Sequence, residues 1–324
     1  MIEVKNLSKN YFSSTSGKFA GIGFPENRAG VYPDKNSGLT FNVNEGEIFG
    51  LIGPDGAGKT TLFRILTTLI LPDSGTASVA GWDVVKDYKE IRKKVGYMPG
   101  RFSLYQDLTV QENLEFFATV FNTTIAENYE LIKDIYIQIE PFKNRRAGKL
   151  SGGMKQKLAL SCALIHKPLV LFLDEPTTGV DPVSRKEFWG MLHKLKLQGI
   201  TILVSTPYMD EAALCDRIAL IQDGHFLNID TPTNIVKQFN RELWAAKSNR
   251  MHYLLTDLRN SDLIDSSFAF GDSIHFTIKN EKEFIAEKLQ LYLENRDHTH
   301  VDIHIIEPNV EDCFMQLSQE KSII

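Results

Sequence analysis

The sequence lacks any long hydrophobic run. Its longest apolar stretches, Leu169–Leu173 and Ile200–Val204, have the length of a strand, whereas a helix that spans a bilayer needs about 20 consecutive apolar residues. The first residues, MIEVKNLSKNYF, also lack the basic stretch and apolar core of a secretory signal peptide. We therefore expect any membrane role to depend on a partner protein.

Cysteine and basic charge are also scarce. The three cysteines, Cys162, Cys215 and Cys313, lie far apart and form no CxxC pair, which favours free thiols in the reducing cytosol. The 36 basic residues are outnumbered by 41 acidic ones, and the formal net charge is −5. An acidic chain has no electrostatic footprint for nucleic acid. We predict a cytoplasmic protein without a nucleic-acid partner.

The order of the remaining patterns predicts two domains. Over the first two thirds of the 324 residues, strand-like apolar runs alternate with helix-like runs, which is typical of an α/β domain with a largely parallel sheet. We predict that this domain covers residues 1–240 and that a small α+β domain covers residues 241–324. Residues 13–38, rich in Gly, Ser, Asn and Pro, are predicted to be a surface insertion.

Individual elements follow from hydrophobic periodicity. Strands are predicted at 46–53, 94–100, 168–176 and 200–206, and a turn followed by a strand is predicted within 71–84. Helices are predicted at 59–70, 109–121, 126–139, 151–165 and 184–199. A further short helix is expected at 208–214, and a hairpin is expected to turn at Asp223-Gly224.

A glycine-rich string joins the first of these strands to the first helix. It matches GxxxxGK[ST], the phosphate-binding loop, in which glycines let consecutive backbone N–H groups turn toward phosphates at a helix N-terminus. The lysine would reach the β- and γ-phosphates, and the following hydroxyl would bind Mg²⁺. The predicted nucleotide-binding residues are Gly53, Pro54, Asp55, Gly56, Ala57, Gly58, Lys59, Thr60 and Thr61.

Two carboxylates end the buried strand LFLDE. A carboxylate at this place can hold Mg²⁺ beside the phosphates, which we assign to Asp174. Because successive side chains of a strand point to opposite faces, the adjacent Glu175 is predicted to act as the general base that polarises the attacking water. Lys59 and Glu175 are therefore the predicted catalytic residues, and Thr60 and Asp174 the predicted metal ligands.

The string LSGGMKQ, residues 150–156, resembles the signature of ABC ATPases. A serine hydroxyl and bare N–H groups at a helix N-terminus can contact a phosphate. In that family the phosphate belongs to ATP on the opposite subunit. The resemblance therefore implies a sandwich of two ATPase subunits in which Ser151, Gly152 and Gly153 contact ATP in trans, with Asp181 of TTGVDP at the same seam. Tyr11 stands where the family places an aromatic that stacks on adenine, although a packing role is equally compatible with the sequence.

The resemblance extends from residue 1 to about 235 and implies the fold, the ligands and the partners. It implies an ABC-type nucleotide-binding domain of the P-loop NTPase class, with a RecA-like core and a helical subdomain, that binds ATP and Mg²⁺. SLYQDLTVQENL and EPNVEDCFMQL resemble ATPases of ABC-2 exporters of drugs and polysaccharides, and GPDGAGKT resembles the first half of tandem exporter ATPases. The expected partners are ABC-2 membrane permeases, a second ATPase subunit or a second copy of the chain, and a membrane-fusion protein. The expected location is the cytoplasmic face of the plasma membrane.

Two positions depart from the family pattern. Gly100 stands where the family has a glutamine that contacts Mg²⁺ and the attacking water, and Pro207 stands where it has a histidine that contacts the γ-phosphate. Pro207 suits the first turn of a helix capped by Ser205 or Thr206. Losing one transition-state contact commonly costs on the order of 10²–10³ in rate, so we expect slow hydrolysis at this chain's own site.

Two other functions remain open. The chain could be a non-catalytic module whose ATP binding only closes the dimer, although the presence of Glu175 argues against full inactivation. A soluble ABC ATPase of translation or DNA repair fits less well, because such proteins carry two ATPase domains or a long coiled coil, and this chain has one set of motifs and no heptad run.

Overall fold

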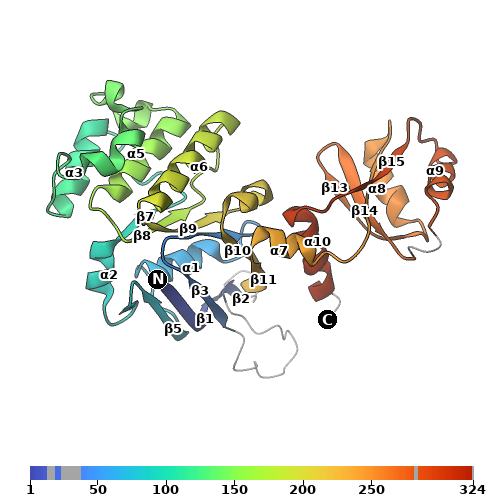
Figure 1. Ribbon diagram of the computed structural model, residues 1–324, viewed down its shortest axis with the longest axis horizontal. Coiled ribbons are helices and arrows are strands. Elements are labelled where there is room, and N and C mark those ends of the chain that lie inside the picture. Colours follow the sequence, from blue (N-terminus) through green and yellow to red (C-terminus); the bar gives the residue numbers. More distant parts are fainter. Residues whose placement is uncertain (13–18, 23–37, 281–283, 323–324) are drawn as a thin grey trace. The chain divides into compact units, whose positions relative to one another are not determined.

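The chain divides into two compact units, Met1–Pro232 and Thr233–Ile324 (Figure 1). The computed structural model describes residues 1–12, 19–22, 38–280 and 284–322. Most of the predicted insertion at 13–38 lies outside these ranges. Among the helices within the described ranges, none is both long and apolar enough to cross a membrane.

A six-stranded sheet forms the centre of the first unit, in the order β11-β10-β4-β9-β8-β7. Its pairs from β10 to β7 are parallel, and β11 is added antiparallel at one edge. Every residue of β4, β8 and β9 is buried, as expected for parallel strands covered on both faces. The strands are β4 Ile48–Ile52, β7 Val95–Met98, β8 Val170–Asp174, β9 Thr201–Thr206, β10 Arg217–Gln222 and β11 His225–Asp230.

The predicted hairpin is confirmed between β10 and β11. Asp223 and Gly224 have positive φ angles of 48° and 80°, as a tight hairpin turn requires. The prediction that Ser205 or Thr206 caps the helix after β9 is wrong. Strand β9 continues through Thr206, and the hydroxyl of Thr206 accepts from the N–H of Tyr208 at 3.1 Å. A 3₁₀ helix, Met209–Leu214, follows without a side-chain cap.

Helices cover the parallel sheet (Figure 1). The part of the chain that connects β7 to β8 folds into a separate layer of helices. In that layer α5 packs against both α3 and α4, and α3 begins with a capping box in which Thr109 and Glu112 exchange hydrogen bonds. The helices are α1 Lys59–Leu66, α2 Tyr88–Lys94, α3 Val110–Val120, α4 Tyr129–Tyr136, α5 Gly152–Leu164 and α6 Pro182–Leu197, with 3₁₀ turns at Glu140–Phe142 and Ala147–Lys149.

The first unit also has an antiparallel sheet, of which the sequence predicted only the strand within 71–84. It runs in the order β2-β1-β5-β6, and β3 also pairs with β1. Its strands are β1 Ile2–Phe12, β2 Phe19–Ile22, β3 Leu39–Val43, β5 Ser74–Val79 and β6 Trp82–Asp83.

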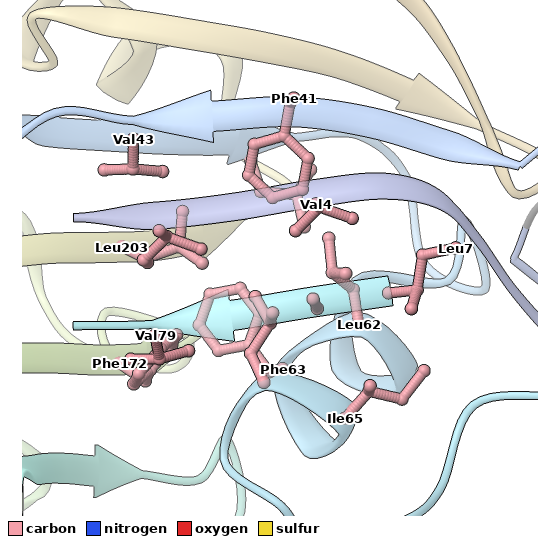
Figure 2. Close-up of a cluster of buried hydrophobic side chains, with 14 of the residues drawn as sticks. Val4, Leu7, Phe41, Val43, Leu62, Phe63, Ile65, Val79, Phe172 and Leu203 are labelled. Atoms are coloured by element: carbon pink, nitrogen blue, oxygen red, sulfur yellow. The ribbon is translucent and has the colours of Figure 1, made fainter. Parts of the chain in front are cut away.

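One hydrophobic core joins the two sheets of the first unit to α1. Figure 2 shows Val4 and Phe41 of the antiparallel sheet beside Leu62 and Phe63 of α1, and Phe172 of β8 belongs to the same cluster. Phe63 meets Phe172 edge to face at 5.9 Å. The helix that follows the glycine-rich loop is therefore held by packing from both sheets.

The second unit has a βαββαβ order with an antiparallel sheet, β13-β14-β12-β15. Leu254 and Leu258 of α8 and Leu289 and Leu293 of α9 share one core with Phe276 of β14. Both helices therefore pack on one face, which is the split β-α-β arrangement of ferredoxin-like folds. The elements are α7 Pro232–Lys237, β12 Leu243–Lys247, α8 Met251–Arg259, β13 Ile264–Phe270, β14 Ser273–Ile278, α9 Ala286–Glu294, β15 Asp302–Ile306 and α10 Val310–Ser322.

Candidate functional site

The glycine-rich loop leaves the carboxyl end of β4, in the middle of the parallel sheet. This is the edge at which open α/β sheets bind ligands. The N–H of Gly53 donates to the carbonyl of Thr206 at 3.3 Å. A Cβ at Gly53 would lie 2.1 Å from the carbonyl oxygen of Ile221, so no other residue fits here without moving the backbone.

The loop then turns into α1 through a left-handed glycine. Gly58 has a φ of 101° and forms the N-cap of α1, a conformation that costs an L-residue with a side chain free energy. A Cβ at Gly56 would meet nothing within 4 Å. The loop therefore borders open space at the start of the helix, where the backbone dipole favours an anion.

Lys59 is held inside this loop. Its side chain is only 3% exposed, and Nζ donates to the carbonyls of Gly53 at 2.8 Å and Pro54 at 3.0 Å. The same ammonium lies 3.1 Å from Oε1 of Glu175. The structure thus brings together the predicted phosphate-binding lysine and the predicted general base.

Ser205, at the end of β9, orients both predicted carboxylates of β8. Its hydroxyl donates to Oδ1 of the buried Asp174 at 2.7 Å and accepts from the N–H of Glu175 at 3.1 Å. Glu175 has a φ of 51°, a conformation that is uncommon for a residue with a side chain and occurs often at functional sites. The sequence suggests only a capping role for Ser205, because its contact with Asp174 depends on the pairing of β8 with β9.

The oxygen groups present suit a magnesium ion bound together with a nucleotide. Thr60 and Asp174 supply a hydroxyl and a carboxylate, which are hard oxygen ligands. No group of three or more His, Cys, Asp or Glu side chains within the described ranges could hold a metal. An ion here would therefore take its remaining ligands from phosphates and water, as Mg²⁺ does.

Gly100 lies directly beside the backbone of Asp174 and Cβ of Glu175. A Cβ at this position would be 3.0 Å from the carbonyl oxygen of Asp174 and 3.8 Å from Cβ of Glu175. Close by in sequence, burial raises the pKa of Tyr97 to about 12, and the negative charge of Asp174 acts in the same direction. Tyr97 therefore stays neutral at the pH of the cell. Gly100 borders the site without contributing a side chain.

The signature segment lies at the start of α5. The Ser151 hydroxyl caps α5 by accepting from the N–H of Met154 at 3.4 Å, and Ser151 and Gly152 are exposed. Within the described ranges, no hydrogen bond or ion pair joins residues 151–153 to Lys59, Asp174 or Glu175. The two sets of predicted site residues thus make no hydrogen bond or ion pair with each other within the described ranges.

Asp181 caps the neighbouring helix, α6. Its carboxylate accepts from the N–H of Ser184 at 2.9 Å, and this bond holds the pKa of Asp181 below its usual value. Gly152 and Gly153 lie close to the same turn, since a Cβ on Gly153 would come within 2.9 Å of the Ser184 hydroxyl. The signature and Asp181 therefore form one exposed surface.

Tyr11 lies in β1 opposite Ala20 of β2, and it is 41% exposed. Its exposure leaves the ring accessible to a ligand. Stacking on adenine stays a prediction.

A buried polar cluster behind the site was also not predicted. Glu211 is 1% exposed, and its Oε1 accepts from the Thr177 hydroxyl at 2.8 Å and lies 3.6 Å from Nε of Arg185. The guanidinium of Arg185 lies 4.1 Å from the centre of the Tyr208 ring. This cluster links α6 to the 3₁₀ helix after β9. Only spatial contact, and no sequence spacing, relates these residues.

Comparison with known proteins agrees with this geometry. Residues 37–178 match the family model described as ABC transporter. The chain is 48% identical over 191 residues to the probable multidrug ABC transporter ATP-binding protein YbhF of Escherichia coli, covering 58% of this chain and 33% of that protein. It is 41% identical over 204 residues to the Nod factor export ATP-binding protein I of Burkholderia lata, covering 62% of this chain and 67% of that protein. The chain thus spans a third of the length of the first of these relatives.

Solved structures show the same fold. The chain resembles a structure described as the ATP binding subunit of an ABC transporter, with a TM-score of 0.61, 26% identity and coverage of 74% of this chain and 93% of that one. It also resembles a dimeric post-hydrolysis state of the ATP-binding cassette MJ0796 bound to ADP and Pi, with a TM-score of 0.60, 25% identity and coverage of 71% and 98%. The predicted P-loop α/β fold is confirmed.

Proposed function

Because the chain belongs to the family of ABC transporter ATP-binding proteins, an ATPase family, we propose that it is the subunit that drives an ABC-2-type exporter by binding and slowly hydrolysing MgATP. The observation that carries the proposal is the arrangement of Lys59, Asp174 and Glu175 at the carboxyl edge of the sheet, with Nζ of Lys59 3.1 Å from Oε1 of Glu175.

Each group has a chemical task in this proposal. The loop N–H groups and Lys59 bind the β- and γ-phosphates, and the lysine exchanges its bonds to the carbonyls of Gly53 and Pro54 for bonds to phosphate oxygens. Thr60 and Asp174 hold the Mg²⁺ that arrives with ATP. Glu175, released from its ion pair with Lys59, accepts the proton of the attacking water.

The signature is proposed to act on the ATP of a second ATPase subunit. The exposed N-terminus of α5 offers a hydroxyl and N–H groups, which suit the γ-phosphate across an interface. ATP bound between two such subunits would hold them together, and its hydrolysis would release them. This subunit can be a second copy of the chain or a different ATPase.

Hydrolysis at the chain's own site is proposed to be slow. Gly100 lies beside Asp174 and Glu175 but offers no amide to the water or metal, and Pro207 offers no donor to the γ-phosphate. In an asymmetric pair, this site would mainly bind ATP and the partner's site would turn it over.

Restoring the family's glutamine at position 100 and its histidine at position 207 tests the proposal that the chain's own site hydrolyses ATP slowly. Gly100→Gln with Pro207→His is expected to raise steady-state ATPase turnover by an order of magnitude or more, measured on the purified chain. The matched control, Gly100→Ala with Pro207→Ala, makes the same backbone changes without the functional groups. The proposal of a weak own site fails if the unmodified chain already turns over like a fully equipped ABC ATPase.

The names of the relatives support export as the process served. They are described as multidrug and Nod factor export proteins, and we propose ABC-2 permeases, with a membrane-fusion protein, as the partners at the cytoplasmic face of the membrane. A binding-only module is the second candidate, favoured by the absence of the family's glutamine at position 100 and of its histidine at position 207. The presence of Glu175 favours hydrolysis.

A further inference from the structure

We propose that the second unit binds a small, uncharged aromatic molecule carrying a hydroxyl group. The site is a cavity of about 170 Å³ bordered by α10, by the segment before β12 and by strands β13 and β14. A cavity of about 150 Å³ is large enough to bind benzene, so this one accommodates a single ring with a substituent. The inference concerns only the second unit and goes beyond the proposed ATPase function.

One part of the cavity wall is apolar and largely aromatic. Phe239, Leu243 and Phe268 line it, and Phe268 lies opposite His275 in the pairing of β13 with β14. Aromatic rings bind other aromatic rings through offset or edge-to-face contacts, beyond the gain from burying apolar area. This wall therefore favours a ring over an aliphatic chain.

The polar part of the wall offers hydrogen bonds at fixed positions. The hydroxyls of Ser266 and Thr277 lie 2.7 Å apart on neighbouring strands. One proton serves that bond, and within the described part of the chain no other hydrogen bond uses the second. Beside them, Nδ1 of His275 bonds to Oδ1 of Asp312 at 2.7 Å, and the ring stacks on Phe270 at 4.1 Å. The Nε2 atom of His275 is thus left in a defined orientation to exchange a hydrogen bond.

The charges that line the cavity are already paired, which selects against a charged ligand. Arg241 forms an ion pair with Asp265. The buried Asp312 accepts from His275, and its second oxygen accepts from the N–H of Asn309 at 2.9 Å. These four side chains are the charged or titratable groups among the described residues of the lining. A ligand with its own charge would have to break one of these pairs or remain unpaired, and both are unfavourable.

Phenol is the probe that matches these properties. We would titrate it into the full-length chain and follow the methyl signal of Thr277 by NMR, with the methyl of Thr201 in the first unit as the internal reference. The expected result is a saturable shift of the Thr277 signal only. Toluene, which has nearly the same shape without the hydroxyl, should bind at least about tenfold more weakly because it offers no hydrogen bond. The charged analogues benzoate and benzylammonium should be weakened at least as much, because their charge would stay unpaired or break an existing ion pair.

Removing the cavity hydroxyl tests the site itself. Ser266→Ala should weaken phenol binding about five- to tenfold, whereas Ser8→Ala, which breaks a comparable hydroxyl pair with Ser74 in the first unit, should leave it unchanged. The proposal is overturned if phenol produces no saturable shift at Thr277, or if benzoate or benzylammonium binds as tightly as phenol. Because binding is read without ATP, the result is independent of the proposed ATPase function.

Discussion

Glu175 is the single residue on which the assignment of hydrolysis depends most directly. Glu175→Gln removes the proton acceptor, and we expect single-turnover hydrolysis to fall by about 10²–10³. MgATP affinity should be kept or increased, because the variant also loses the 3.1 Å ion pair that competes for Lys59. Quenched-flow hydrolysis and equilibrium nucleotide binding measure the two effects.

The control for this variant is Glu187→Gln. Glu187 also pairs with a lysine, Lys157, at 2.8 Å, but it lies on α6 and outside the site, so hydrolysis should not change. If Glu175→Gln leaves the residual activity unaltered, the chain is better described as a binding-only module.

The sequence predicted those site residues that stand together in one continuous motif. Lys59 and Thr60 could be placed because a glycine-rich turn between a strand and a helix permits few arrangements. Ser205 could not, since its hydrogen bonds to Asp174 and Glu175 depend on which strand lies beside β8. The role of a residue that acts through a neighbouring strand becomes visible only when the sheet order is known.

At the scale of elements, two substitutions of Asp181 at the N-terminus of α6 distinguish its structural role as a helix cap from a functional role. Asp181→Ala removes the cap on Ser184 and should lower the denaturant midpoint of unfolding. Asp181→Asn keeps a capping oxygen, since asparagine caps about as well as aspartate, and should leave the midpoint nearly unchanged. Both variants should reduce ATPase activity if the carboxylate also acts at the seam between subunits. Full activity of Asp181→Asn would restrict the residue to capping.

Elements were predictable where burial leaves a clear pattern. Strands β4, β8 and β9 are buried along their whole length, and their continuous apolar runs were identified. A strand was expected within 71–84, where β5 lies. The antiparallel sheet to which β5 belongs was not expected, because β3 alternates over only five residues and β1 pairs with strands far from it along the chain. In the second unit β13, with the sequence IDSSFAF, buries only two of its residues, so its pattern was too weak to identify a strand.

At the scale of the whole molecule, the cluster around Lys59 and the signature segment of the first unit have complementary roles in the proposed function. In the proposed function the cluster around Lys59 binds a nucleotide, and within the described ranges no hydrogen bond or ion pair joins this cluster to the signature, whose donors would need the phosphate of another subunit's ATP. An isologous pair, in which each copy completes the site of the other, fulfils both roles. A signature that acts in trans, as proposed, requires two subunits.

Complementation between two inactive variants tests this requirement. Lys59→Ala disables a chain's own site, and Gly152→Asp places a negative charge where the partner's phosphate would bind. The structure accepts the second change, because a Cβ at Gly152 makes only an ordinary 3.5 Å contact with the carbonyl of Gly179. At Gly153 the same change would clash with Ser184 at 2.9 Å.

Each variant alone should be nearly inactive. In an equal mixture, about half of the pairs would be mixed and each would contain one complete site, so about a quarter of the unmodified ATPase activity should return. Gly152→Ala serves as the control, since it adds the Cβ without the charge and should remain active alone. Activity of Gly152→Asp by itself, or no recovery in the mixture although both variants bind to each other, would contradict a signature that acts in trans.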